Sequence, residues 1–289
     1  MLVHLSLSFF LSLWHPNNFN NKKIPPQHCH CENPLVPHRS SYNVEYWNRA
    51  FRRNRELSNA SSSANLVLYG DARIEHWLGT HSGVPKEHHE GTRGVYQQLF
   101  NTTDDDSSAS AVRGVPLGIA GDGCSQLLFR LQNGELPASL QPRVIWVLIG
   151  SIDLDALCSV GTIVTGSIAV VRYLQHARPN AIVVMNSLLP WLSGSGETTE
   201  EAVSLHDTPI WQKTQQVNHQ LECWAQSQTP SVDGSGGIEF FNATPFFLNE
   251  AGTHVDPDLM ESFEYPTAAG ALKWGQGILD RVQELLTNL

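Results

Sequence analysis

Five apolar runs occur along the chain, and each of them has the length of a strand. They occupy residues 66–69, 115–119, 144–149, 181–186 and 238–241. The runs show little alternation of apolar and polar positions, a pattern typical of parallel strands that are covered on both faces. We therefore predict five buried strands.

Segments with helical spacing of apolar residues fill most of the intervals between these runs. They lie at residues 46–57, 94–100, 125–131, 160–177, 209–225 and 268–286. The last segment places Leu272, Ile278 and Val282 on one apolar stripe, and Pro266-Thr267 just before it is a helix start signal. Because strands alternate with helices, the sequence predicts an α/β fold with right-handed crossovers and a doubly wound sheet.

The N-terminal part of the chain lacks this alternation. Residues 15–40 are rich in Asn, Pro and His and have no periodicity, so we interpret them as a linker. Polar stretches at 102–110, 193–205 and 227–237 predict surface loops. We expect an N-terminal apolar segment and linker over residues 1–40 and one domain over residues 41–289.

Composition excludes one class of function. The 289 residues, 41% of them hydrophobic, are enough for a sizeable core. The formal net charge is −10, and no basic stripe is present to neutralise phosphates. These features argue against a nucleic-acid partner.

The cysteines do not form a zinc-binding pattern. Cys29-His30-Cys31 is too tightly spaced for the usual ligand pairs and has no second half elsewhere in the chain. We expect a local bridge or free thiols, and neither a metal site nor a cofactor.

The first 14 residues are apolar but too few to span a bilayer, which needs about 20 residues. They are similar to the apolar region of a secretory signal, yet a basic start and a small-x-small cleavage site are both missing. Glycosylation triplets at Asn59, Asn101 and Asn242 are compatible with secretion. A signal or membrane anchor is one interpretation; a wrongly assigned start or an unstructured tail, which would leave the protein cytoplasmic, is the other.

Three glycine-containing turns directly follow predicted strands. They are Gly70-Asp71-Ala72, Gly121-Asp122-Gly123 and Gly150-Ser151-Ile152-Asp153. In an open α/β sheet, ligands bind in the crevice outside the carboxyl ends of the strands. The three turns are therefore expected to face one cleft.

Several ordered motifs add a family resemblance. Residues 118–122 read Gly-Ile-Ala-Gly-Asp, residues 127–136 read Leu-Leu-Phe-Arg-Leu-Gln-Asn-Gly-Glu-Leu, and an apolar run ending at Gly150 follows. Gly70-Asp71, Leu188-Leu189-Pro190 and Val217-Asn218 occur at matching places. With these motifs, residues 64–289 resemble the SGNH (GDSL-type) esterase superfamily, and within it the alpha subunits of platelet-activating factor acetylhydrolase.

This resemblance implies more than the residues alone establish. It implies a three-layer α/β/α, flavodoxin-like fold with a five-stranded parallel sheet, so that residues 41–289 would be an SGNH hydrolase-type esterase domain. It also implies ester hydrolysis by a Ser-His-Asp arrangement, with an oxyanion hole made by a backbone N–H, a glycine and an asparagine. The resembled group assembles through dimers.

The reactive positions of that family are substituted in this chain. The serine position is occupied by Ala72, and the asparagine position by Ile152, although Gly150 and Asp153 on either side of it are retained. The aspartate and histidine positions align with Ser262 and Tyr265, and no histidine follows His254. The oxyanion glycine is retained as Gly121.

These substitutions remove the chemistry of ester cleavage. Alanine has no heteroatom that can attack an acyl carbon. A tyrosine with a pKa near 10 is a poor general base at neutral pH, and isoleucine donates no hydrogen bond to an oxyanion. We therefore interpret the chain as a non-catalytic member of the superfamily that acts as a binding or interaction protein.

An active ester hydrolase with a rearranged site is the alternative. Cys124 could act as the nucleophile with a carboxylate or His254 as its base, or a pair among Asp71, Asp122 and Asp153 could do acid–base work. Structural interpretations compete with each of these: Cys124 as a small packed residue, and Asp71 and Asp122 as acceptors of backbone N–H groups in their own turns. Ser151, like Ser125, is interpreted as a cap or turn residue.

The expected partners follow from the same two interpretations. A retained cleft would suit a small acyl, glycan or lipid ligand. The dimeric habit of the resembled group suggests a homodimer or a heterodimer with an active paralogue.

Overall fold

Five parallel strands form the central sheet, in the order β4-β1-β5-β6-β7. The strands are β1 (Leu66–Gly70), β4 (Gly114–Gly118), β5 (Val144–Leu148), β6 (Ile182–Asn186) and β7 (Gly237–Phe241). All five predicted strands are confirmed, each end within one residue. The computed structural model describes residues 31–41, 43–100, 111–190, 208–228, 236–261 and 264–287.

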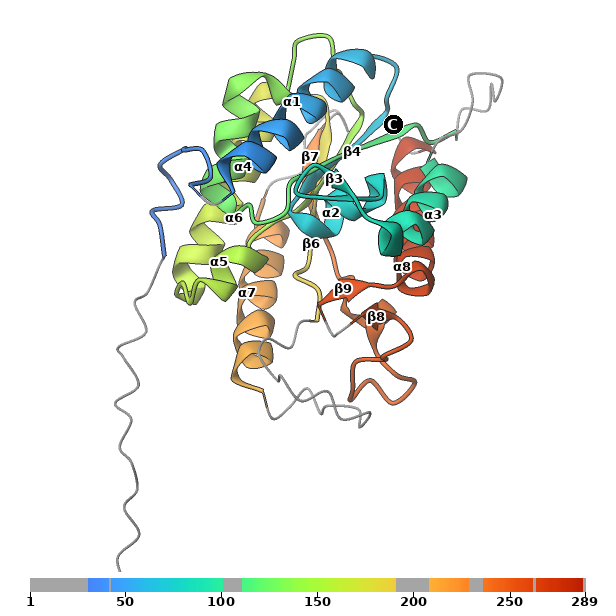
Figure 1. Ribbon diagram of the computed structural model, residues 1–289. Coiled ribbons are helices and arrows are strands. Elements are labelled where there is room, and N and C mark those ends of the chain that lie inside the picture. The colour runs from blue at the N-terminus through green and yellow to red at the C-terminus, as the bar shows by residue number, and fades with distance from the viewer. Residues whose placement is uncertain are drawn as a thin grey trace, which may run out of the picture.

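Helices cover both faces of this sheet, so the predicted three-layer α/β/α fold is confirmed (Figure 1). One face carries α1 (Val44–Ala60), α4 (Cys124–Arg130), α6 (Val160–Ala177) and α7 (Pro209–Gln226). The other face carries α3 (Glu90–Phe100), which packs against α8 (Ala268–Thr287). All six predicted helices are present. Helix α3 begins earlier than predicted because the 3-10 turn η2 (Glu87–His89) leads into it through polar residues that show no apolar period.

A shared acceptor links the sheet to helix α8 inside the core. The indole N–H groups of Trp146 and Trp274 both donate to Oδ1 of Asn186, over 3.0 Å and 3.1 Å. All three side chains are buried. The buried amide thus satisfies two indole donors that the apolar core could not.

Several short elements were not predicted, because two to five residues are too few to show a period. Helix α2 (Ala72–Glu75) runs into the 3-10 turn η1 (His76–Leu78), and the hairpin of β2 (Thr80–His81) and β3 (Val84–Pro85) follows. A second hairpin joins β8 (Met260–Glu261) to β9 (Tyr265–Pro266). The remaining short elements are α5 (Ser151–Asp155), the π-turn η3 (Leu131–Glu135) and η5 (Thr244–Phe247).

One disulfide corrects the expectation of a local bridge. Cys31 is bonded to Cys158, 127 residues away, with 5.0 Å between the Cα atoms. Pro34 in the same segment packs against Gly166 of α6, where an added Cβ would lie 2.7 Å from the proline Cβ. Residues 31–41 are thereby attached to the α6 side of the domain.

Some predicted segments lie outside the described residues. They are the apolar N-terminus, the loops at 102–110 and 193–205, and most of the loop at 227–237. Among the described residues, no helix combines the length and the apolar character needed to cross a membrane.

Candidate functional site

The three predicted turns lie side by side at the carboxyl edge of the sheet, because β1 pairs with both β4 and β5. The second and third turns touch directly: the backbone N–H of Cys124 donates to Oδ2 of Asp153 over 3.0 Å. A Cβ on Gly123 would lie 2.9 Å from both carboxylate oxygens of Asp153, so this approach needs a glycine. The structure therefore brings together the residues that the sequence proposed for one cleft.

Asp71 has a structural role in the first turn. It caps helix α2, accepting the backbone N–H of Arg73 over 2.9 Å, and its other oxygen pairs with the Arg73 guanidinium over 3.1 Å. The carboxylate is fully buried. This is the role of turn acceptor that the sequence suggested for Asp71. Ala72, which the sequence analysis aligned with the family's serine, is the first residue of the helix and is buried.

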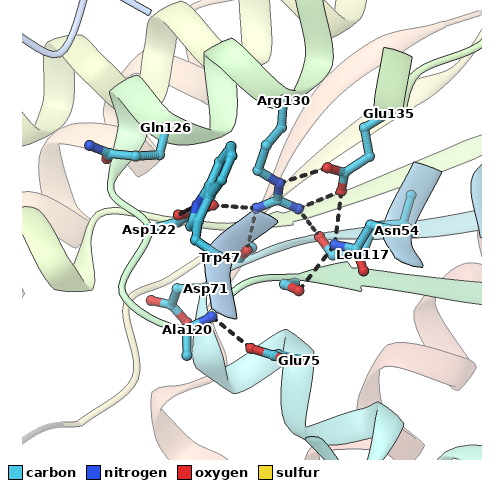
Figure 2. Close-up of polar contacts among 12 residues, drawn as sticks. Trp47, Asn54, Asp71, Glu75, Leu117, Ala120, Asp122, Gln126, Arg130 and Glu135 are labelled. Atoms are coloured by element: carbon cyan, nitrogen blue, oxygen red, sulfur yellow. Dashed lines mark hydrogen bonds and ion pairs between the residues drawn. The ribbon is translucent and has the colours of Figure 1, made fainter. Parts of the chain in front are cut away.

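Asp122 differs from the expectation that it would accept backbone N–H groups of its own turn. Its two oxygens instead accept from the indole of Trp47 over 2.7 Å and from the guanidinium of Arg130 over 2.8 Å (Figure 2). Burial raises the pKa of Asp122 to about 7, although both contacts favour the ionised form. These partners come from α1 and α4, so they could not be inferred from the sequence around the turn.

Arg130 connects this aspartate to the motif at residues 127–136. The fully buried guanidinium also binds both carboxylate oxygens of Glu135, at 2.5 Å and 2.7 Å, and the carbonyl oxygens of Gly70 and Leu117 (Figure 2). Each N–H group of the guanidinium donates a hydrogen bond, and the ammonium group of a lysine could not reproduce this set of contacts. The motif therefore fastens β1, β4 and α4 together.

The third turn contains an unusual hydroxyl. Ser151 is 3% exposed, and its Oγ has no hydrogen-bond partner among the residues that the structure describes. Gly150 precedes it with φ +115°, a conformation that favours glycine. Burial raises the pKa of Asp153, and Ile152, which the sequence analysis aligned with the family's asparagine, is half-buried. Gly121, on the neighbouring turn, is exposed with φ +86°.

Tyr265, which the sequence analysis aligned with the family's histidine, lies beside helix α2. The Arg73 guanidinium carbon is 5.7 Å from the centre of its ring, and the ring of His76 meets it edge-on at 4.7 Å. Burial raises the pKa of the Tyr265 phenol despite the nearby Arg73. Ser262, which the sequence analysis aligned with the family's aspartate, is outside the described residues.

The alternative nucleophile Cys124 is enclosed between helices. It is fully buried, and its thiol lies 3.7 Å from the hydroxyl of Ser167 on α6. Burial raises the pKa of this thiol well above its usual range. His254, the candidate base, contacts the hydroxyl of Thr253 over 2.8 Å instead. The contacts of Cys124 are therefore those of a packed small residue.

The structure also gathers three histidines that the sequence analysis did not select. His76, His81 and His89 each offer a ring nitrogen, and these nitrogens all lie within 4.8 Å of one another. A pocket of about 320 Å³ adjoins them, lined by His81, Lys86, His88, His89, Glu261, Glu264 and Tyr265. The intervals of five and eight residues match no standard ligand pattern, so only the tight run of short elements from η1 to η2 reveals the cluster.

Comparison with known proteins agrees with this architecture. The chain is 29% identical to human platelet-activating factor acetylhydrolase IB subunit alpha1 over 168 residues, 58% of this chain and 59% of that protein. It is 32% identical to the alpha2 subunit of Gallus gallus over 192 residues, 66% of this chain and 70% of that protein. The match thus spans about three fifths of the alpha1 subunits.

A solved structure shows the same fold. A GDSL-like lipase from Bacteroides thetaiotaomicron superposes with a TM-score of 0.56 at 16% identity, over 82% of this chain and 97% of that chain. No family sequence model matches the chain.

Proposed function

Since this chain belongs to the family of platelet-activating factor acetylhydrolase IB alpha subunits, within the SGNH hydrolase superfamily, we propose that it is a member without serine ester hydrolysis. The proposal rests on one observation above the others. Ala72 is the first residue of α2, directly after Gly70-Asp71, where the family's serine is expected. A methyl group at that point closes the covalent route.

Two further positions support this proposal. Tyr265 keeps its phenolic proton at neutral pH, because burial moves its pKa further above 10. Ile152 supplies no donor for an oxyanion, and such a donor contributes about 100- to 1000-fold in rate elsewhere. In a comparable triad, loss of the nucleophile or the base costs about a million-fold.

The polar residues that remain near the turns are already engaged. Asp122 has a pKa suited to a general base, but both of its oxygens are bonded to Trp47 and Arg130 and the residue is fully buried. Asp71 is bound by Arg73, and Cys124 is enclosed by α6. A substrate could reach none of these three groups without breaking the packing around it.

The retained scaffold supports a binding role. The Arg130 network holds the carboxyl edge of the sheet in place although the reactive groups are absent. We propose a small acyl, glycan or lipid ligand at this edge, and pairing either with a second copy of the chain or with an active paralogue. Sedimentation of the chain, alone and mixed with an active alpha subunit, tests the pairing; a monomer in both samples would contradict it.

Hydrolysis of p-nitrophenyl acetate tests the loss of catalysis. We expect the wild-type chain and its Ser151→Ala and Cys124→Ser variants to share one background rate. These two variants remove the hydroxyl without a partner and the alternative thiol. Enzymatic turnover that either substitution abolishes would overturn the proposal.

Reconstruction provides the complementary experiment. Ala72→Ser alone should remain inactive, because no base has been restored with the nucleophile. Adding Ile152→Asn, Ser262→Asp and Tyr265→His returns the whole family arrangement, and activity is expected only then. Recovery by the single change would reveal a base that the proposal excludes.

We further propose that the chain matures in an oxidising compartment. A disulfide between Cys31 and Cys158 persists where thiols are not kept reduced. The glycosylation triplets at Asn59 and Asn242 have exposed asparagines. Expression in a secreting eukaryotic cell should give glycans at these two sites that an N-glycosidase removes; unmodified secreted protein would contradict the glycosylation.

A further inference from the structure

The three histidines beside Tyr265 form a compact group. Nε2 of His76 and Nδ1 of His81 are 3.0 Å apart, and the rings of His76 and His89 stack with 3.5 Å between centroids. His76 is 2% exposed and His89 4% exposed. Nδ1 of His76 has no hydrogen-bond partner within the described part of the chain. Nε2 of the same ring faces His81, so Nε2 of His76 and Nδ1 of His81 are the pair that could share a ligand.

We propose that His76, His81 and His89 bind a divalent transition-metal ion, with zinc as the best match. Two imidazole nitrogens on a tetrahedral zinc, each about 2.0–2.1 Å from the ion, lie about 3.3 Å from one another. The separation of 3.0 Å between His76 and His81 is already close to this value. The nitrogen of His89 lies within 4.8 Å of the other two, but its ring stacks on that of His76 and must turn so that its lone pair points at the ion. Imidazole ligands suit zinc, copper, iron and nickel.

The surrounding chain holds two of the ligands in place. Glu75 immediately precedes His76, and its buried carboxylate accepts the backbone N–H groups of Ser82 and Gly83 over 2.9 Å and 2.7 Å. The hydroxyl of Thr80 donates to the same carboxylate over 2.9 Å. The hairpin that carries His81 is therefore fastened to the helix end that carries His76. Preorganisation of this kind reduces the entropy lost when an ion binds.

The protonation of the group favours metal binding. Burial lowers the pKa of His76 to about 2 and that of His89 to about 4, and it lowers the pKa of His81 as well. Burial thus favours the uncharged ring, which is the form that coordinates a metal.

The pocket supplies an open position next to the ion. Three protein ligands leave a fourth site for water or for an oxygen of a ligand. Glu261 and Glu264 also line the pocket and offer carboxylates, and Lys86 adds a cation to the same lining. Tyr265 contacts His76, His81 and Arg73, so the metal would lie close to helix α2, which begins at Ala72.

A metal titration of the full chain, purified without a histidine tag, tests the proposal. The protein is stripped with EDTA and titrated with zinc ions in competition with a chromophoric chelator. We expect one equivalent per chain and, with cobalt in place of zinc, the visible absorption of a low-coordinate site. His81→Ala and His89→Ala should weaken zinc binding at least about 100-fold, while His176→Ala on the exposed face of α6 should leave it unchanged.

The neighbouring histidine sharpens the assignment. His88 is exposed and lies next to His89 with 4.0 Å between ring centres, but it is outside the group of three. His88→Ala should therefore bind zinc with at most a few-fold change. Because His81 is only half-buried, His81→Ala should keep the far-UV circular dichroism of the stripped wild-type chain and remain an informative variant.

Two results would overturn the metal site. The first is the absence of stoichiometric zinc binding to the folded, stripped chain. The second is zinc binding that His81→Ala and His89→Ala leave intact. Ester hydrolysis, measured on stripped and on zinc-loaded protein, reports separately on the proposed loss of catalysis: zinc-dependent turnover would sustain the site and contradict that loss.

Discussion

The carboxylate of Glu75 accepts the backbone N–H of Ala120 over 2.7 Å and so joins the end of α2 to the loop that follows β4 (Figure 2). The same side chain accepts the N–H groups of Ser82 and Gly83. One fully buried carboxylate therefore connects the end of α2 to the loop after β4 and to the β2–β3 hairpin. This carboxylate is important because the backbone N–H groups of Ala120, Ser82 and Gly83 have no other acceptor among the described residues.

Glu75→Gln should destabilise the fold by about 3 kcal/mol, because the new amide NH₂ faces backbone N–H groups whichever way it points. Urea denaturation gives the free energy of unfolding, and Glu56→Gln on the exposed side of α1 is the matched control. The control should change stability by less than about 0.5 kcal/mol. Equal stabilities for the two variants would contradict the role of Glu75.

Two glycines provide a second matched comparison. A Cβ on Gly118 would lie 2.2 Å from the backbone nitrogen of Glu75 and 2.5 Å from the carbonyl oxygen of Asp71, neither of which can move without displacing α2. Gly94, exposed in α3, has nothing within 4 Å of the same added atom. Gly118→Ala should therefore destabilise by at least about 3 kcal/mol, whereas Gly94→Ala should stabilise by about 0.5–1 kcal/mol. Thermal unfolding of both variants measures the contrast, and a neutral Gly118→Ala would show that α2 is not closely seated on β4.

The disulfide gives the third prediction. Removing it with Cys31→Ser should lower the free energy of unfolding by about 2–5 kcal/mol, since the bridge closes a long loop of the unfolded chain. Cys223→Ser, at an exposed free thiol, is the control and should have little effect. Peptide mapping without reductant should recover Cys31 linked to Cys158. A different pairing, or equal stabilities of the two variants, would contradict the bridge.

The sequence predicted the scaffold better than the contacts at the site, for a physical reason. The β5 and β6 strands are buried on both faces, and their apolar runs signal this directly. The partner of Asp122 is Trp47, 75 residues away, and that pairing depends on how α1 packs against β4. The pattern of apolar and polar positions around either residue does not predict this pairing.

The histidine cluster was missed for a similar reason. His76, His81 and His89 lie on a 3-10 turn, a two-residue strand and another 3-10 turn. These elements are too short to produce a period, so the spacing of their residues carries no signal. In contrast, Ala72 and Ile152 could be proposed as substituted positions from the sequence because family motifs flank them closely, and this assignment stays a prediction.

The buried histidines predict how stability changes with pH in the metal-free protein. The pKa of His76 is lowered to about 2 and that of His89 to about 4, below the usual histidine value of 6.5. The folded chain therefore binds fewer protons than the unfolded chain. The contribution of the uncharged rings to the free energy of unfolding is fully present above pH 6.5 and is lost as the pH falls. For His89 the loss runs down to about pH 4, and for His76 it continues to about pH 2.

Urea denaturation in EDTA at pH 7.0 and pH 5.0 measures this effect, which amounts to about 1.4 kcal/mol per pH unit for each proton taken up on unfolding. His89→Asn should be less stable at pH 7 but should lose less on acidification than the wild-type chain. His176→Ala, at an exposed site, should follow the wild-type profile. If His89→Asn followed that profile as well, the ring of His89 would titrate normally, and burial would not hold it in the neutral form.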